Sequence, residues 1–225
     1  MIKSRIALAG GLLAVAGAAN AGSFTVSPAV TSDYDFRGVT QTQEDPAFQL
    51  GVNYAHDSGF YAGVWGSNVD FGPGDPSMEV DLFTGFAGGD AAESFGYDVG
   101  VIYYAYPGAS SLDTFELYAG ISKSIFSAKL WYSPDIASTS TDGFYVEGNV
   151  AYPLPSGFAL KGHIGYTFGD ASWSGPVEET DYSIGVDYTF RNITLGVKYV
   201  DGSGVLKDRN MTIATISTTL PWASE

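Results

Sequence analysis

The 225-residue chain contains no cysteine, which excludes a disulfide framework, a zinc–thiolate site and a cysteine nucleophile. Charged residues are also scarce, at 16% against the ~25% that is usual for soluble domains. Only 10 Lys and Arg oppose 25 Asp and Glu, and a net charge of −15 is unsuited to binding a nucleic-acid backbone. Aromatic residues, in contrast, reach 15%, which excludes a disordered chain.

The first 21 residues have the three parts of a secretory signal peptide. Lys3 and Arg5 give a positive start, residues 6–17 form an apolar run, and residues 19–21 read Ala-Asn-Ala, an A-x-A cleavage site. The apolar run is shorter than the ~20 residues that a transmembrane helix needs. We therefore expect export with cleavage near Ala21, and a mature chain over residues 22–225 that forms a single domain.

Beyond residue 21, apolar side chains alternate with small or polar ones at a period of two, which is typical of half-buried β-strands. In the clearest case, Phe158, Leu160 and Ile164 lie on one face while Lys161 and His163 lie on the other. The pattern predicts twelve strands, over residues 24–36, 48–54, 59–68, 78–87, 95–106, 114–123, 127–133, 143–152, 158–168, 181–190, 193–201 and 210–220.

The apolar face of these strands is sorted along its length. Tyr182 and Phe190, for example, bracket Ile184 and Val186. Aromatic rings settle at membrane–water interfaces and aliphatic side chains settle in the hydrocarbon, so this order favours a membrane barrel over a soluble core.

The opposite face carries too many charges for a dry core, because burying them would cost more than pairing recovers. It belongs against water, and we interpret its ionisable residues as a pore lining: Glu79, Asp81, Glu116, Lys129, Glu147, Lys161, His163, Asp181, Asp187 and Lys198.

Connections between the strands alternate in length. Long connections are expected at 37–46, 68–77, 107–113, 134–142, 169–180 and 201–210, whereas turns such as 154–157 and 191–192 are short. Bacterial outer-membrane barrels have long outside loops, short periplasmic turns and tilted strands of ~9–11 residues. The sequence therefore predicts an all-β fold, an antiparallel transmembrane barrel of about twelve strands, with both termini in the periplasm.

One segment near the mature N-terminus resembles a known family. Residues 31–41 read Thr-Ser-Asp-Tyr-Asp-Phe-Arg-Gly-Val-Thr-Gln, which is similar to the opening signature of the TorF-like porin family, also catalogued as Gcw_chp. The matching positions are Thr31, Ser32, Asp33, Tyr34, Phe36, Arg37, Gly38 and Gln41. The resemblance is specific over residues 31–85, diffuse beyond them, and implies an outer-membrane channel of unestablished substrate. The chain departs from many such barrels at its end, where residues 220–225 read Leu-Pro-Trp-Ala-Ser-Glu rather than closing on an aromatic residue.

The expected function is passive diffusion of small hydrophilic solutes or ions, with a modest preference for cations because acidic loops lie above an acidic lumen. Cross-strand pairing would narrow this lumen. We expect Lys129 opposite Glu147, His163 opposite Asp187, and Lys198 diagonal to Asp187. Inward aromatic residues would narrow it further: Tyr104, Tyr118, Trp131 and Tyr145.

Two other functions remain open at this stage. A barrel hydrolase could use His163, oriented by Asp187 and facing Ser183, and a structural or adhesive barrel would not conduct at all. We predict no enzyme activity, catalytic residue, metal site or cofactor. The expected partners are outer-membrane lipid, the barrel assembly machinery and periplasmic chaperones during biogenesis, and a small hydrophilic solute, with no nucleic acid.

Overall fold

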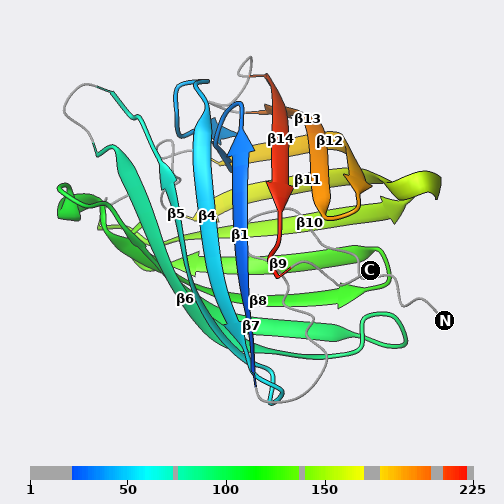
Figure 1. Ribbon diagram of the computed structural model, residues 1–225. Coiled ribbons are helices and arrows are strands. Elements are labelled where there is room, and N and C mark those ends of the chain that lie inside the picture. Colours follow the sequence, from blue (N-terminus) through cyan, green and yellow to red (C-terminus); the bar gives the residue numbers. More distant parts are fainter. Residues whose placement is uncertain (1–21, 73–75, 137–139, 170–177, 204–209, 222–225) are drawn as a thin grey trace.

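The computed structural model describes residues 22–72, 76–136, 140–169, 178–203 and 210–221; the predicted signal peptide lies outside them. Twelve long strands form one closed antiparallel barrel (Figure 1), in which β14 pairs with β1 to close the ring. These strands are β1 (Ser23–Thr31), β4 (Ala47–Ala55), β5 (Phe60–Asn68), β6 (Met78–Gly89), β7 (Gly96–Ala105), β8 (Thr114–Lys123), β9 (Phe126–Ser133), β10 (Gly143–Pro153), β11 (Phe158–Gly169), β12 (Glu179–Phe190), β13 (Ile193–Gly202) and β14 (Met211–Thr218).

Little else in the described residues is regular. A small hairpin pairs β2 (Asp35–Phe36) with β3 (Val39–Thr40), and two single-turn 3-10 helices, η1 (Ser110–Leu112) and η3 (Pro155–Gly157), lie in connections. Among the described residues, no helix has the length and apolar character needed to cross a membrane.

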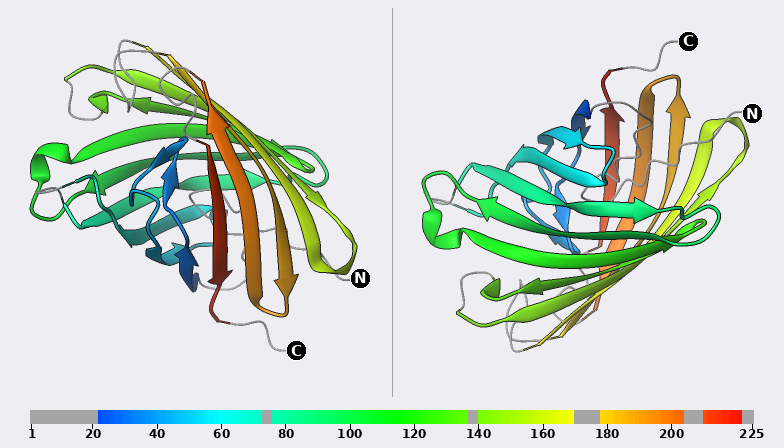
Figure 2. Two further views of the ribbon diagram at one scale, coloured as in Figure 1. Left: turned by 90° about the horizontal axis from the view of Figure 1, so that it is seen from above. Right: turned by 90° about the horizontal axis from the view of Figure 1, so that it is seen from below.

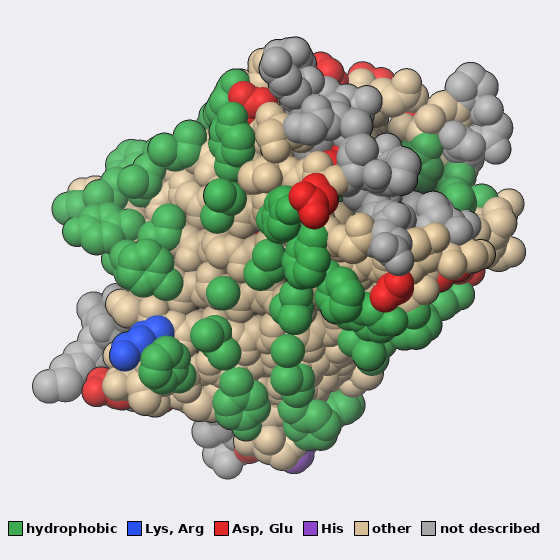
Figure 3. All heavy atoms as spheres, turned by 180° about the vertical axis from the view of Figure 1, so that it is seen from behind, with side chains coloured by type: hydrophobic (Ala, Val, Ile, Leu, Met, Phe, Trp, Pro, Cys, Tyr) green, Lys and Arg blue, Asp and Glu red, His purple; other side chains and the backbone are tan. Residues whose placement is uncertain are grey.

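The predicted alternation is confirmed in most of the strands, most clearly in β6, β8 and β12, and it is weakest in β5. Large apolar side chains on the outward parity are exposed, such as Leu82, Ile164 and Ile184. From behind (Figure 3), apolar side chains are spread over this outer surface and few charged ones lie among them. Aromatic residues such as Tyr97 and Phe190 stand at the strand ends, as the sequence predicts. The outer surface is therefore built for an apolar surrounding.

The strands are joined by short turns at one end of the barrel and longer segments at the other. β1 begins at Ser23, which pairs with Ala55 beside the 56–59 turn, and β14 ends at Thr218, which pairs with Ile193 beside the 191–192 turn. The start of β1 and the end of β14 therefore both lie at the end of the barrel that carries the short turns.

The first strand is shorter than predicted. β1 ends at Thr31, where it pairs with Ala47 of β4, and residues 32–46 leave the barrel wall once the Ser32 N–H has bonded to the Ala214 carbonyl of β14 at 2.8 Å. We call these residues the plug segment, because they turn into the lumen and carry β2 and β3 with them (Figure 2). The predicted strand over residues 24–36, whose alternation puts Tyr34 and Phe36 on the apolar outward face with Phe24, was therefore wrong beyond Thr31. The alternation continues past Thr31 because β2 is itself extended, but its side chains meet the interior of the barrel.

Closure between β1 and β14 is short. Regular pairing covers residues 29–31 against 215–217, and Leu220 bonds to Val26 through both backbone groups. Pro28 lies between these two contacts on the same edge of β1 and has no N–H to donate. Leu220 thus forms the last contact of the wall, while residues 222–225 lie outside the described part.

Candidate functional site

The plug segment is held in shape by its own acidic residues. Arg37 and Gly38 form the tight turn between β2 and β3, with φ angles of 53° and 79°. The Asp35 carboxylate accepts the Gly38 N–H at 2.9 Å, and the Asp33 carboxylate accepts the Thr40 hydroxyl at 2.6 Å. Aspartate side chains commonly stabilise turns in this way, so the sequence of residues 33–40 encodes a compact hairpin.

Arg37 anchors this hairpin to the far wall. Its two terminal nitrogens donate to the two oxygens of Glu116 on β8, each at 2.8 Å. Both side chains are buried, with 8% and 2% of their surface exposed. Such a bidentate pair is among the strongest polar contacts in proteins. The guanidinium also lies over the rings of Tyr145 and Trp131, at 4.2 and 5.5 Å from their centroids.

The ionisation of the plug residues follows from this packing. Burial alone would lower the pKa of Arg37, but the Glu116 carboxylate together with Tyr104 and Tyr145 raises that pKa above its usual value. Burial, together with nearby Glu79, raises the pKa of Tyr34 well above its usual value. Arg37 therefore stays a cation and Tyr34 stays a hydrogen-bond donor at physiological pH.

Two further contacts tie the plug to other walls. Tyr34 donates to Glu79 on β6 at 2.7 Å, and Lys198 on β13 donates to Asp35 at 2.6 Å. Because β6, β8 and β13 stand at different places around the ring, the plug segment spans the lumen rather than lining one side of it.

The half of the lumen near the long connections is filled. Phe36 of the plug packs against a buried cluster that comprises Phe83, Ile102, Tyr104, Tyr106, Tyr118, Trp131 and Tyr145. Glu79 is buried there and accepts from Tyr106 as well as from Tyr34. One oxygen of Asp81 is buried with no hydrogen-bond partner among the described residues.

The half near the short turns is more open. Lys129 pairs with Asp98 at 2.7 Å, and Lys161 pairs with Asp187 at 3.5 Å. These four side chains keep between 17% and 30% of their surface exposed, so solvent reaches them. We call this half the vestibule; it is lined by paired charges of both signs.

The register corrects one predicted pair and modifies two others. His163 lies opposite Ser183, not Asp187, because β12 begins at Glu179, two residues before the predicted start, and Glu179 pairs with Thr167 of β11. Glu147 does lie opposite Lys129, but the Lys129 ammonium turns to Asp98. Lys198 is diagonal to Asp187 as expected, yet its ammonium bonds to Asp35 of the plug, which the sequence pattern had placed in the wall.

His163 is not arranged as a catalytic base. Its Nε2 lies 2.8 Å from Asp181 and 3.0 Å from the Tyr145 hydroxyl, while its Nδ1 lies 2.7 Å from the Asn149 carbonyl oxygen. With both ring nitrogens engaged, neither is left to take a proton from Ser183. His163 instead joins a hydrogen-bonded network that braces β10, β11 and β12.

The ten ionisable residues proposed to line the pore all lie on the inward parity of their strands. Glu79, Asp81, Glu116 and Asp181 are buried in the filled half, and the other six are partly exposed. Sequence reasoning missed the role of Arg37, which it took only as part of a signature. One signal was available: Arg37 is the only Lys or Arg between Arg5 and Lys123.

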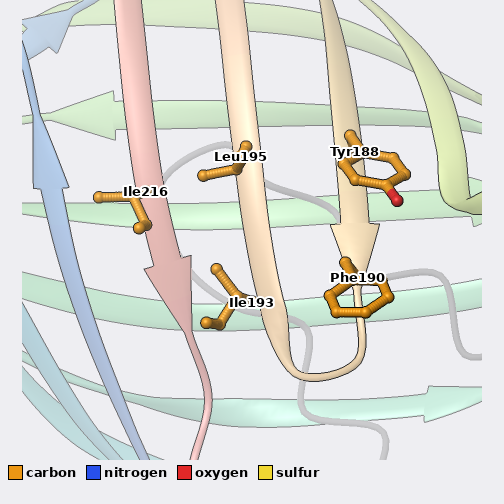
Figure 4. Close-up of a pocket in the computed structure, with 5 residues that line it drawn as sticks. All are labelled: Tyr188, Phe190, Ile193, Leu195 and Ile216. Atoms are coloured by element: carbon orange, nitrogen blue, oxygen red, sulfur yellow. The ribbon is translucent and has the colours of Figure 1, made fainter.

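Other kinds of site find little support in the described residues. No group of three or more His, Asp or Glu is placed there to hold a metal ion. An apolar groove of about 480 Å³ lies on the outer surface of β12, β13 and β14 (Figure 4), lined by Tyr188, Phe190, Ile193, Leu195 and Ile216. The Tyr188 hydroxyl is the one polar side-chain group among these five residues, whereas a solute site needs several convergent polar groups.

A family model for bacterial proteins of unknown function, Gcw_chp, matches residues 15–218. The chain belongs to the Gcw_chp family. No curated protein sequence matches it.

Solved barrels are similar to this Gcw_chp chain in fold. The KdgM porin aligns with a TM-score of 0.58 and 11% identity, over 89% of this chain and 99% of that one. The NanC porin gives 0.54 and 10% identity, over 88% and 98%. The COG4313 outer membrane channel from Pseudomonas putida F1 gives 0.54 and 11%, over 90% and 96%. At such low identity these structural alignments show a shared barrel fold and nothing finer. The structural neighbours are outer-membrane porins and channels.

Proposed function

We propose that this chain is a passive channel of the bacterial outer membrane for small hydrophilic solutes or ions, with a modest preference for cations, and that it is a TorF-like porin. The observation that carries the proposal is the closed barrel with an apolar exterior and a charged interior. In lipid, closure satisfies the backbone groups and the apolar exterior satisfies the hydrocarbon.

The charge of the interior supports the cation preference. Among the described residues, the bases of the lumen are Arg37, Lys129, Lys161 and Lys198, and the carboxylates of Glu79, Asp81, Glu147 and Asp181 lie there in addition to the four carboxylates that pair with these bases. An acidic passage concentrates cations and repels anions. One similar structure is the KdgM porin in complex with disordered oligogalacturonate. Because oligogalacturonate is a polyanion, the acidic lumen of the present chain points to a different class of solute.

The plug segment makes this a restricted channel. Passage across the filled half requires residues 32–46 to shift, because their anchors reach three separate walls. We therefore propose low conductance at rest. Export with a cleaved signal peptide (residues 1–21), chaperone escort through the periplasm and insertion by the barrel assembly machinery complete the proposal.

The test is conductance of the folded protein, purified from outer membranes, in a planar lipid bilayer under a salt gradient. Discrete conductance steps with a cation-selective reversal potential are the expected result. The absence of any step from protein shown to be folded and inserted would overturn the channel and favour a binding or structural barrel.

A further inference from the structure

The surroundings of Arg37 form a cage for a planar cation. The guanidinium carbon lies 4.2 Å from the ring centre of Tyr145 and 5.5 Å from that of Trp131, and Glu116 closes the cage with two hydrogen bonds of 2.8 Å. A guanidinium suits such a site better than an ammonium does, because its planar fork matches a carboxylate and its face stacks on rings.

The barrel walls hold this cage together without help from the plug. Trp131 donates its indole N–H to Glu147 at 2.9 Å, and the Tyr145 hydroxyl donates to the Asp181 carboxylate at 3.1 Å. The Tyr104 hydroxyl donates to Glu116 at 2.8 Å. All of these residues belong to wall strands, so the cage stays formed when Arg37 leaves it. A preformed site loses little conformational entropy when a ligand binds.

An emptied cage would require another cation. The Glu116 side chain is 2% exposed, and its hydrogen bonds come from Arg37 and Tyr104. Lys129 approaches the Trp131 ring at 5.1 Å, but its ammonium is paired with Asp98, and Lys161 is paired with Asp187. A buried carboxylate without a counter-ion is unfavourable, so the walls alone favour an incoming cation.

We propose that Glu116, Trp131, Tyr145 and Tyr104 form a binding site for guanidinium compounds, and that Arg37 occupies it as a tethered ligand. The proposal deepens the channel function, on which it rests, by naming the class of solute. A guanidinium solute that takes the place of Arg37 removes the strongest anchor of the plug, so that solute binding and loosening of the plug are one event. Because a tethered ligand competes at an effective concentration in the millimolar range, the intact protein should respond only to millimolar solute.

The test is isothermal titration of the folded, membrane-purified protein in detergent with ethylguanidinium, and with ethylammonium as a probe of equal charge that lacks the fork. Arg37→Ala vacates the cage and should bind ethylguanidinium about tenfold or more tightly than the wild type does. It should also prefer ethylguanidinium over ethylammonium. Arg37→Ala/Glu116→Gln should lose this binding. Arg191→Ala, which removes an arginine from an exposed turn, should behave as the wild type.

Equal binding of the two probes by Arg37→Ala, or affinity no higher than that of the wild type, would overturn the proposal. If that variant does not fold, replacing residues 32–46 by a short Asn-Gly turn vacates the same cage, and absence of ethylguanidinium binding there overturns the proposal equally. The titration requires no conduction. Binding of ethylguanidinium without any conductance would support the cage and overturn the channel function. Conductance without such binding would support the channel function and overturn the cage.

Discussion

At the scale of single residues, the lumen contains few bases, and each of them neutralises a particular carboxylate. Arg37 faces Glu116 in the filled half, and each of the three lysines in the lumen has its own carboxylate in Asp98, Asp187 or Asp35. Loss of any one base leaves a carboxylate unpaired, but only Glu116 is almost fully buried when this happens. The Arg37–Glu116 pair should therefore matter most to stability.

This difference gives a prediction for stability. Breaking a buried pair by removing one partner usually costs about 3–5 kcal/mol, and release of the plug would let water reach Glu116, which limits the loss to the lower end. Arg37→Ala should thus lower the free energy of unfolding by about 3 kcal/mol, measured by urea unfolding in lipid vesicles. Adding Glu116→Gln should restore about half of it, because the stranded charge is gone. A double variant less stable than Arg37→Ala would contradict this account.

At the scale of elements, the twelve strands could be predicted from sequence because each of them has one face against an apolar surrounding and one against a polar interior. That arrangement leaves a period of two that is readable in any single strand, as in Phe158–Gly169. The plug could not be predicted, because Tyr34 and Phe36 keep the same period in an extended hairpin whose apolar surrounding is the aromatic cluster of the lumen. Periodicity shows only that one face of a segment meets an apolar surrounding. It does not distinguish the lipid-facing outer surface from the aromatic cluster inside the lumen.

For the candidate site, too, the sequence predicts which side chains face inward but not how they pair. Alternation alone places all ten ionisable residues on the inward face, but pairing depends on the register across long connections and on the plug. The sequence pattern sets neither, so His163 was assigned to Asp187 instead of Asp181, and Lys198 was left without Asp35.

Removal of the plug is the corresponding prediction. Thr31 and Ala47 are directly paired on β1 and β4, so a two-residue Asn-Gly turn with short flanks can replace residues 32–46 without moving either strand. The variant should keep its β-sheet circular dichroism and gain several-fold in single-channel conductance, because three anchors across the lumen are gone.

The matched control shortens another connection between directly paired residues. Gly89 and Gly96 pair on β6 and β7, and the same turn in place of residues 90–95 changes only an exposed loop at the short-turn end. It should leave conductance unchanged. If both variants conduct like the wild type, the plug does not restrict the passage.

At the scale of the whole molecule, the plug divides one acidic lumen into two parts that meet solvent differently. Glu79 and Asp81 are buried behind it in the filled half, whereas Asp98 and Asp187 lie in the vestibule beside lysines. Net negative charge therefore concentrates in the half that the plug closes, and selectivity for ions should depend on whether the plug is present.

The last prediction follows from this division. In the plug-replaced variant, Glu79 and Asp81 border an open path, and Coulomb's law gives each about 0.4 kcal/mol on an ion ~10 Å away in water. Neutralising both by Glu79→Gln and Asp81→Asn should lower the cation-to-anion permeability ratio about two- to fourfold after screening, as read from reversal potentials under a salt gradient. The same two changes should shift the ratio by a smaller factor in the protein with its plug, because Glu79 is then bonded to Tyr34 and Tyr106 and lies farther from the path of the ions. Glu93→Gln, in an exposed turn, is the control for charge alone and should have no effect in either background. A shift of equal size with and without the plug would mean that ions pass these carboxylates while the plug is in place, and the division of the lumen would be wrong.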